Sequence, residues 1–115
     1  MTDESGNPNI EQGLRQVVED FGVFFEQSGL PRMAGRILGW LMVCEPPHQT
    51  MDELAEALGA SKGSISGNCR LLVQVQLIER TSIPGERRDF FSMRSDAWAV
   101  MTRSNSSRAS RWLQT

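Results

Sequence analysis

Two short helices joined by a tight turn are the most clearly patterned part of the chain. From residue 51 to residue 58, apolar residues recur at i, i+3, i+4 and i+7, the spacing that lines one face of an α-helix: Met51, Leu54, Ala55 and Leu58. Thr50 and Glu53 stand three residues apart, which predicts a capping box, and Gly59 is typical of a helix C-terminus. The pattern therefore predicts a helix that begins near Met51 and buries this face.

A second helix is predicted over residues 61–73, with Ser61 as its N-cap and with Ile65, Cys69 and Leu72 on its apolar face. Its other side carries small or hydrogen-bonding side chains and two cations: Lys62, Gly63, Ser64, Ser66, Gly67, Asn68 and Arg70. Each glycine weakens a helix by about 1 kcal/mol relative to alanine, so another advantage must favour glycine here. Close approach to the major groove of DNA is one such advantage. A loosely specified solvent-exposed face is the alternative.

Two longer helices are predicted upstream. From residue 10 to about residue 27, apolar residues form a heptad-like stripe: Ile10, Leu14, Val17, Val18, Phe21, Phe24 and Phe25. This stripe suits either the core of a monomer or packing against a second subunit, and both interpretations stay open. Pro31 starts the next helix, which runs to Cys44. Gly35 and Gly39, four residues apart in it, would let a neighbouring helix approach closely.

A β-hairpin is predicted after the paired helices, because residues 77–82 and 89–94 have the composition of strands and flank a turn that carries Arg87 and Arg88. Three helices followed by a hairpin outline a winged helix-turn-helix, a fold that is mainly α with a small β-hairpin wing (α+β). In that fold the last of the three helices enters the major groove, and the hairpin tip, residues 83–89, reaches the DNA backbone or the minor groove. Ser95 is expected to begin a short C-terminal helix that ends near Met101.

The length of 115 residues predicts one domain. We expect residues 1–9 to form a disordered leader and residues 10–101 to form the winged helix-turn-helix with its N-terminal dimerisation helix. Residues 102–115 carry three arginines and no acidic residue, which is typical of a flexible, basic, serine-rich tail. A truncated dimerisation helix is the alternative interpretation of this segment.

Composition and charge limit the classes of protein to which this chain can belong. The net charge of −2 is unusual for a DNA-binding protein, yet residues 60–94 hold six bases and three acids, whereas residues 1–29 hold six acids and one base. No apolar run could span a membrane, and the N-terminus lacks the features of a signal peptide, so a cytoplasmic protein is expected. Cys44 and Cys69 are expected to be buried free thiols, and His48 an exposed loop residue. No nucleophile motif, metal-ligand spacing or phosphate loop is present, so neither an enzyme nor a cofactor or metal is expected.

In combination, the phrases GLPRMAGRILGWLMVCEPP, MDELAEALGASKGSIS and LIERTSIPGERRDFFSMR resemble the MarR superfamily of bacterial regulators, and within it the GbsR-like branch. The resemblance implies a dimeric winged-helix DNA-binding protein, in most cases a repressor, and several such proteins respond to small molecules. It places the recognition helix at Ser61–Arg70 and the wing at Gly85–Asp89. The short tail departs from the family's long C-terminal helix, so a dimer would rest mainly on residues 10–25 or be arranged differently.

The patterns predict a DNA-binding protein, and the resemblance implies that it is a homodimeric transcriptional repressor. The expected DNA contacts are Ser61, Lys62, Ser64, Ser66, Asn68, Arg70, Arg87 and Arg88. The four cations would contact phosphate or the minor groove, Ser64, Ser66 and Asn68 would face base edges, and Ser61 would both cap the helix and donate to phosphate. A winged-helix module that binds protein and not DNA is the alternative. The expected effector pocket consists of Phe21, Phe25, Trp40 and Trp98, although aromatic residues also fill protein cores.

Overall fold

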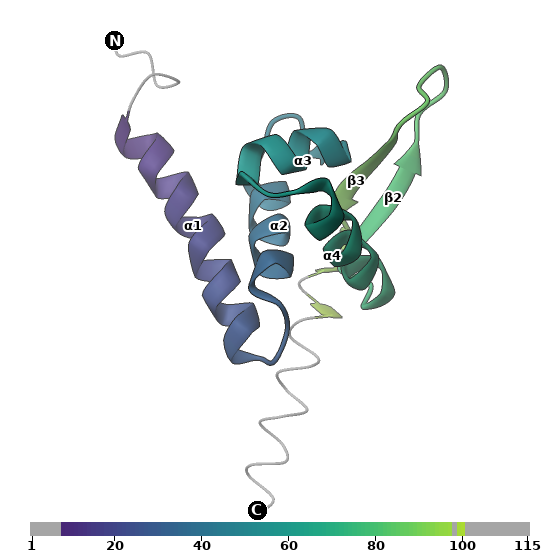
Figure 1. The fold of residues 1–115 in the computed structure, drawn as a ribbon. Coiled ribbons are helices and arrows are strands. Elements are labelled where there is room, and N and C mark those ends of the chain that lie inside the picture. The colour runs from purple at the N-terminus through teal and green to yellow at the C-terminus, as the bar shows by residue number, and fades with distance from the viewer. Residues whose placement is uncertain (1–7, 98, 101–115) are drawn as a thin grey trace, which may run out of the picture.

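Four helices and a three-stranded sheet make up the part of the chain that the computed structural model describes, residues 8–97 and 99–100 (Figure 1). The elements follow one another in the order α1 (Pro8–Gln27), α2 (Arg32–Val43), β1 (His48–Gln49), α3 (Met51–Leu58), α4 (Lys62–Gln74), β2 (Ile78–Ser82) and β3 (Asp89–Met93). The expected fold class, mainly helical with a small β-hairpin wing, is confirmed. None of the described helices combines the length and apolar character needed to cross a membrane.

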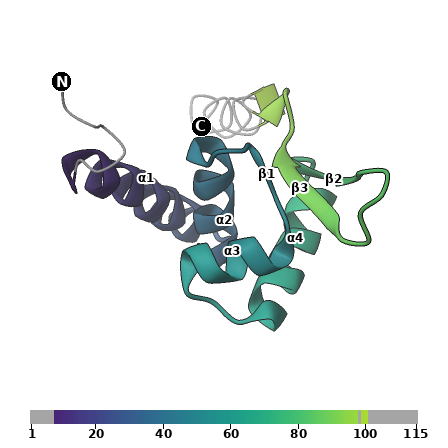
Figure 2. The ribbon, with the colours of Figure 1, turned by 90° about the horizontal axis from the view of Figure 1, so that it is seen from above.

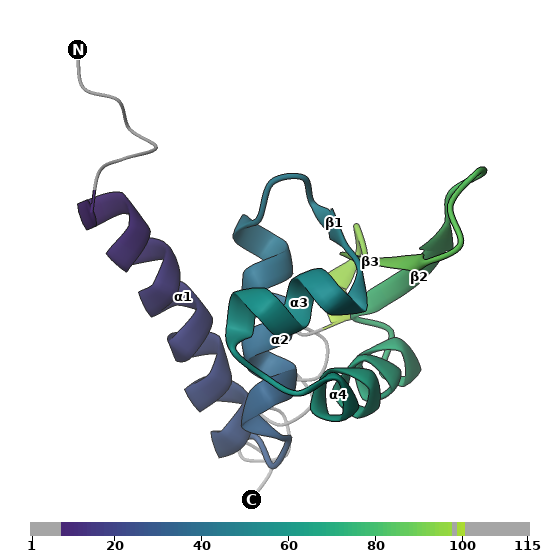
Figure 3. The same cartoon turned by 45° about the horizontal axis from the view of Figure 1, so that its top comes forward.

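The predicted helix pair forms through the expected local interactions. The Glu53 backbone N–H donates to Thr50 Oγ1 at 3.1 Å, and the Thr50 backbone N–H donates to Glu53 Oε1 at 2.8 Å, which completes the capping box of α3. Gly59 ends α3 in the left-handed conformation with φ of 62°. Ser61 Oγ accepts a hydrogen bond from the Ser64 backbone N–H at 3.1 Å and caps α4. Figure 3 shows the two helices joined by their turn, with the hairpin beside them.

Helix α1 lies against α2 at a distance that only glycine permits. A Cβ atom added at Gly35 would stand 2.2 Å from the backbone oxygen of Phe21, and one added at Gly39 would stand 3.1 Å from the Cα of Val18. Both distances are shorter than ordinary contacts, so the backbone of α1 occupies the space that side chains would fill. The close approach predicted from this glycine pair is confirmed.

The sheet is antiparallel with strand order β1-β3-β2, and β2 and β3 form the predicted hairpin. Gly85, with φ of 88°, turns the chain at its tip.

The expectation that His48 is an exposed loop residue was wrong. This residue is half-buried in β1, where it pairs with Ser92, and its ring centroid lies 5.2 Å from that of Phe90. A two-residue strand has too little periodicity to be detected, and its partner strand lies about forty residues away.

One hydrophobic core joins these elements. Its largest fully buried side chains come from α1, α2, α3, α4 and β2: Phe25, Ile37, Leu38, Leu41, Leu54, Ile65, Leu72 and Ile78. Helix α2 packs against α1, α3 and α4. Seen from above, α1 covers one side of α2 while the hairpin lies on the opposite side of the molecule (Figure 2).

Several boundaries and one burial assignment differ from the expectation. Helix α1 begins at Pro8 and not at Ile10, because proline suits the first helical position, so residues 8 and 9 do not belong to a leader. Pro31 is the N-cap of α2, with extended backbone angles, and not its first residue. Met51 is 37% exposed, because the first turn of α3 lies at the edge of the core.

At the C-terminal end, Ala97, Ala99 and Val100 are helical, where the short helix was expected. The remaining expectations for the ends of the chain, which concern residues 1–7, Trp98 and residues 101–115, lie outside the described residues.

Candidate nucleic-acid interface

Helix α4 divides into a core face and an outer face as predicted. Ile65, Cys69 and Leu72 are buried against the core. On the outer face the cations and glycines are exposed, and the short polar side chains are half-buried: Lys62, Gly63, Gly67 and Arg70 in the first group, and Ser64, Ser66 and Asn68 in the second. The residues expected to approach DNA therefore lie together on the open side of this helix.

The two glycines of the outer face have no packing function among the described residues. A Cβ atom added at Gly63 or Gly67 would have no neighbouring atom within 4 Å, in contrast to Gly35 in α2. Neither glycine has the positive φ that would require it. The described chain therefore does not need glycine at these two positions, and the absence of side chains there leaves room for another surface to approach α4 closely.

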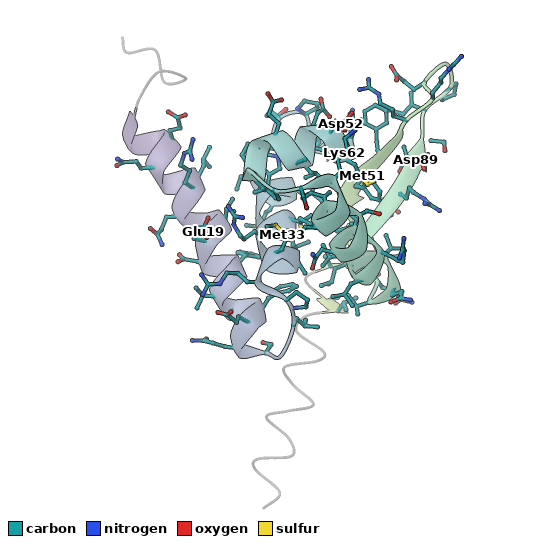
Figure 4. The ribbon with its side chains drawn as sticks, viewed as in Figure 1. Glu19, Met33, Met51, Asp52, Lys62 and Asp89 are labelled. Carbon is teal, nitrogen blue, oxygen red and sulfur yellow. The ribbon has the colours of Figure 1, made fainter. Side chains whose placement is uncertain are left out.

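A cavity of about 450 Å³ lies between the N-terminal ends of α3 and α4 and the hairpin. We call it the hairpin cleft; its lining residues are Thr50, Met51, Asp52, Lys62, Gly63, Ser66, Arg88 and Asp89. Figure 4 shows Met51, Asp52 and Lys62 gathered where the two helices meet the hairpin, and Asp89 on the hairpin side. The cleft thus connects the predicted recognition helix to the predicted wing.

A second cavity, of about 240 Å³, adjoins the hairpin cleft, because Met51 and Ser66 line both. It lies between the C-terminal half of α4 and the strands, and its polar lining consists of Ser66, Arg70, Gln74 and Arg80. The two cavities together follow α4 along most of its length. Together the two cavities form one concave surface between α4 and the hairpin. Part of the outer face of α4 lines it, namely Lys62, Gly63, Ser66 and Arg70, and the hairpin contributes Arg80, Arg88 and Asp89.

The cations of this surface differ in their partners. Lys62 Nζ lies 2.8 Å from Asp52 Oδ1, Arg88 Nη2 lies 3.6 Å from Glu86 Oε1, and Arg80 Nε lies 3.7 Å from Asp89 Oδ2. Exposed ion pairs of this kind contribute only about 0–1 kcal/mol, so phosphate oxygens can replace the carboxylates. Within the described part of the chain, Arg70 and Arg87 form no ion pair. These two guanidinium groups are available to an anion without the loss of an existing partner.

The polar side chains of α4 retain hydrogen-bonding capacity. Asn68 Nδ2 donates to the Ser64 backbone oxygen at 2.8 Å. This bond uses one of the two amide hydrogens and leaves the second hydrogen and Oδ1 free, which is the pair of groups that reads adenine in the major groove. The hydroxyl of Ser61 accepts the capping bond and keeps its own hydrogen for donation.

The sequence reasoning missed several residues of the concave surface, among them Met51, Asp52 and Arg80. Met51 fits the apolar stripe of α3, and Asp52 looks like an ordinary acidic residue in the first turn of a helix. Arg80 lies opposite Phe91 in the hairpin register. The charge count over residues 60–94 included this arginine, and that count was the one feature that could have indicated it.

The residues of the expected effector pocket have different surroundings in the described part of the chain. Phe25 is 2% exposed and belongs to the core, and the side chain of Phe21 packs against α2 at Gly39. Trp98 lies outside the described residues. Trp40 does line a cavity of about 360 Å³ between α1, α2 and α3, with the apolar residues Leu14, Val18, Ala57 and Leu58 and the charged residues Glu11, Arg15, Glu19 and Arg36. Of the predicted set, Trp40 alone among the described residues borders this space.

The described residues contain no group of three or more histidine, cysteine or acidic side chains placed to hold a metal ion. Cys44 and Cys69 are buried and free, as predicted. Burial raises the pKa of Cys44 to about 11 and that of Cys69 to about 12, so both remain protonated thiols at neutral pH.

A capped helix pair, a core helix behind it and a hairpin beside the second helix define the winged helix-turn-helix class. The chain belongs to the MarR family, whose sequence profile matches residues 28–89. It is 48% identical over 90 residues to the HTH-type transcriptional regulator MmpR5 of Mycobacterium tuberculosis, an alignment that covers 78% of this chain and 54% of that protein.

Two further comparisons agree with this assignment. The HTH-type transcriptional repressor OpcR of Bacillus subtilis is 29% identical over 87 residues, which are 76% of this chain and 46% of that protein. A crystal structure described as a transcriptional regulator superposes with a TM-score of 0.75 at 46% identity, covering 89% of this chain and 69% of the other. The chain spans about half the length of the curated relatives it matches.

Proposed function

We propose that this protein is a DNA-binding transcriptional repressor of the GbsR-like branch that acts as a homodimer. Helix α4 enters the major groove, and the hairpin tip, residues 83–89, contacts the backbone or the minor groove. One observation carries the proposal: Gly63 and Gly67 face open space on a helix whose opposite side is fully buried, beside a hairpin with two arginines at its tip. The names of the relatives, a regulator and a repressor, agree with it.

Each residue of the surface has a role in this proposal. Lys62, Arg70, Arg87 and Arg88 contact phosphate or the minor groove, and the Ser61 hydroxyl donates to a phosphate at the start of α4. Ser64, Ser66 and Asn68 face base edges, because their side chains are short and keep hydrogen-bonding groups free. Arg80 joins the phosphate contacts, since it lines the same concave surface as Arg70.

The substitution Gly67→Leu is expected to have opposite effects on stability and on DNA affinity. We expect the free energy of unfolding to be equal or higher, because leucine favours a helix more than glycine and meets no neighbour. We expect affinity for duplex DNA to fall by about tenfold or more, which corresponds to about 1.4 kcal/mol, because the new side chain holds α4 away from the groove. Urea unfolding and fluorescence anisotropy with labelled duplex DNA measure the two effects.

The matched control for this experiment is Gln12→Leu, which adds the same side chain to an exposed position of α1. Its affinity for DNA should equal that of the original protein. If Gly67→Leu binds DNA as tightly as the control, α4 does not enter a groove. If the original protein fails to bind duplex DNA at low salt, a winged-helix module that binds protein becomes the better proposal.

Exposed apolar side chains of α1 support dimerisation. Val23 and Phe24, neighbours in the second half of α1, are 38% and 44% exposed, although both are apolar. A second copy of this helix would cover them. Two-fold symmetry would also present two α4 helices to successive major-groove faces about 34 Å apart.

An effector is proposed for the cavity beside Trp40. Its walls combine apolar side chains with the Glu19–Arg36 ion pair, at 3.1 Å, and an indole whose N–H donates to Gln49 Oε1 at 3.2 Å. An apolar or cationic metabolite with an aromatic contact fits this lining.

We expect such a metabolite to raise the melting temperature of the original protein and to leave that of Trp40→Leu unchanged. A thermal-shift panel of small metabolites measures both. A panel without any stabilising compound would indicate that Trp40 serves the core alone.

A further inference from the structure

Asp52 is one of two acidic residues that line the hairpin cleft, together with the cations Lys62 and Arg88; the other is Asp89. Asp52 lies in the first turn of α3 next to Glu53, but the two carboxylates have different partners. Glu53 completes the capping box on its own helix, whereas Asp52 Oδ1 reaches across to Lys62 Nζ in α4 at 2.8 Å. Figure 4 shows this pair at the meeting point of the two helices. The capping of α3 therefore does not depend on the Asp52 side chain.

The carboxylate of Asp52 shares the hairpin cleft with two of the cations that we propose contact DNA phosphate. Asp52, Lys62 and Arg88 all line the hairpin cleft. Lys62, through its hydrogen bond and then its charge, lowers the pKa of Asp52, and the charge of Arg88 lowers it further. Asp52 is therefore ionised at neutral pH and attracts the same two cations that a phosphate would need.

A phosphate at this site meets two obstacles. It must displace a carboxylate from Lys62, and it must then remain close to that negative charge. Both side chains of the pair are largely exposed, 52% for Asp52 and 73% for Lys62, so the pair adds little to the stability of the fold. The Asp52–Lys62 pair has a larger effect on the binding of an anion that approaches the hairpin cleft than on the stability of the fold.

We propose that Asp52 is an affinity-setting residue: its carboxylate occupies Lys62 in the free protein and opposes phosphate at the hairpin cleft, which keeps DNA binding weaker and less salt-dependent than the arginines and lysine alone would make it. This inference rests on the proposed DNA-binding function. It assigns to Asp52 an effect on all DNA sequences alike, because phosphates carry no base identity.

The variant Asp52→Asn tests this assignment, since asparagine keeps the size and the polar character of the side chain and removes its charge. Binding is measured by anisotropy with a 30-base-pair duplex of random sequence and with duplexes selected by the original protein, from 50 to 200 mM salt. We expect Asp52→Asn to bind both kinds of DNA about tenfold more tightly at about 0.1 M salt, with a slope of log K against log salt steeper by about one unit.

The matched control is Glu56→Gln, which removes one negative charge from the same helix but at a residue that does not line either cavity beside α4. Its affinity should rise by no more than about twofold, because among the described residues Glu56 forms no ion pair with Lys62 or Arg88 and acts on an approaching phosphate only through a solvent-screened charge. The double variant Asp52→Asn/Lys62→Gln should gain less over Lys62→Gln than Asp52→Asn gains over the original protein, because Asp52 acts in part through Lys62.

Four outcomes are distinguishable. A gain for Asp52→Asn on both DNAs, absent from Glu56→Gln, supports the inference. An equal gain for both variants assigns the effect to net charge and overturns it. Unchanged or weaker binding by Asp52→Asn, while the original protein binds DNA with normal salt dependence, overturns the inference and leaves the proposed function standing. Absence of DNA binding by every variant and by the original protein overturns both.

Discussion

The substitution Gly35→Ala is expected to lower the free energy of unfolding by about 3 kcal/mol, at the upper end of the cost of overpacking a core. The added Cβ would lie 2.2 Å from the Phe21 backbone oxygen and 2.7 Å from its carbonyl carbon. Both atoms belong to the backbone of α1 and cannot rotate away, so α1 must move as a whole and lose contact with α2. Urea unfolding followed by circular dichroism measures the effect.

Two other glycines provide the comparison. Gly39→Ala should destabilise less, by about 1 kcal/mol, because its Cβ would lie 3.1 Å and 3.2 Å from atoms of Val18 and Phe21. Gly67→Ala should raise the free energy of unfolding by about 1 kcal/mol, because it meets nothing and gains helix propensity. If all three variants have equal stability, α1 does not lie as close to α2 as the structure shows.

The double variant Arg87→Ala/Arg88→Ala is expected to bind duplex DNA about a hundredfold more weakly at about 0.1 M salt, through the loss of two phosphate or minor-groove contacts. The slope of log K against log salt should become shallower by about two units. The loss should be equal for selected and random DNA, because backbone contacts carry no sequence information. Salt titrations with both kinds of duplex measure these quantities.

The pair Arg15→Ala/Arg32→Ala serves as the matched control, since it removes two positive charges from the side of the molecule formed by α1 and α2. Its salt slope should match that of the original protein. An unchanged slope for the Arg87→Ala/Arg88→Ala variant would exclude the hairpin tip from the interface, whatever the role of α4.

Local sequence patterns predicted the helix pair and the hairpin correctly because the interactions that end these elements are themselves local. Thr50 and Glu53 are three residues apart, and Gly59 adopts its left-handed conformation without help from distant residues. The outer face of α4 could also be predicted from the sequence, because Ile65, Cys69 and Leu72 show which side of the helix is buried. The roles assigned to individual residues of that face remain predictions.

What the sequence could not provide depends on distant segments. Strand β1 exists because β3 pairs with it, and no pattern within His48–Gln49 indicates that partner. Asp52 and Lys62 are ten positions apart in two different helices, so their ion pair follows from the angle between α3 and α4. Trp40 was assigned to a cavity with phenylalanines that instead fill the core, because helical periodicity does not reveal which part of a stripe a neighbour covers.

The direct contact between the α1 backbone and Gly35 has a consequence for assembly. At Gly35 no side chain separates the two backbones, so α1 cannot shift toward α2 at this point by a small adjustment, and α2 also packs against α4. A tilt of α1 would therefore move α2 with it, and through α2 it would move α4. In a two-fold complex joined at α1, the angle between the subunits would dictate how far apart the paired α4 helices stand, and hence whether both could engage the same stretch of duplex at once.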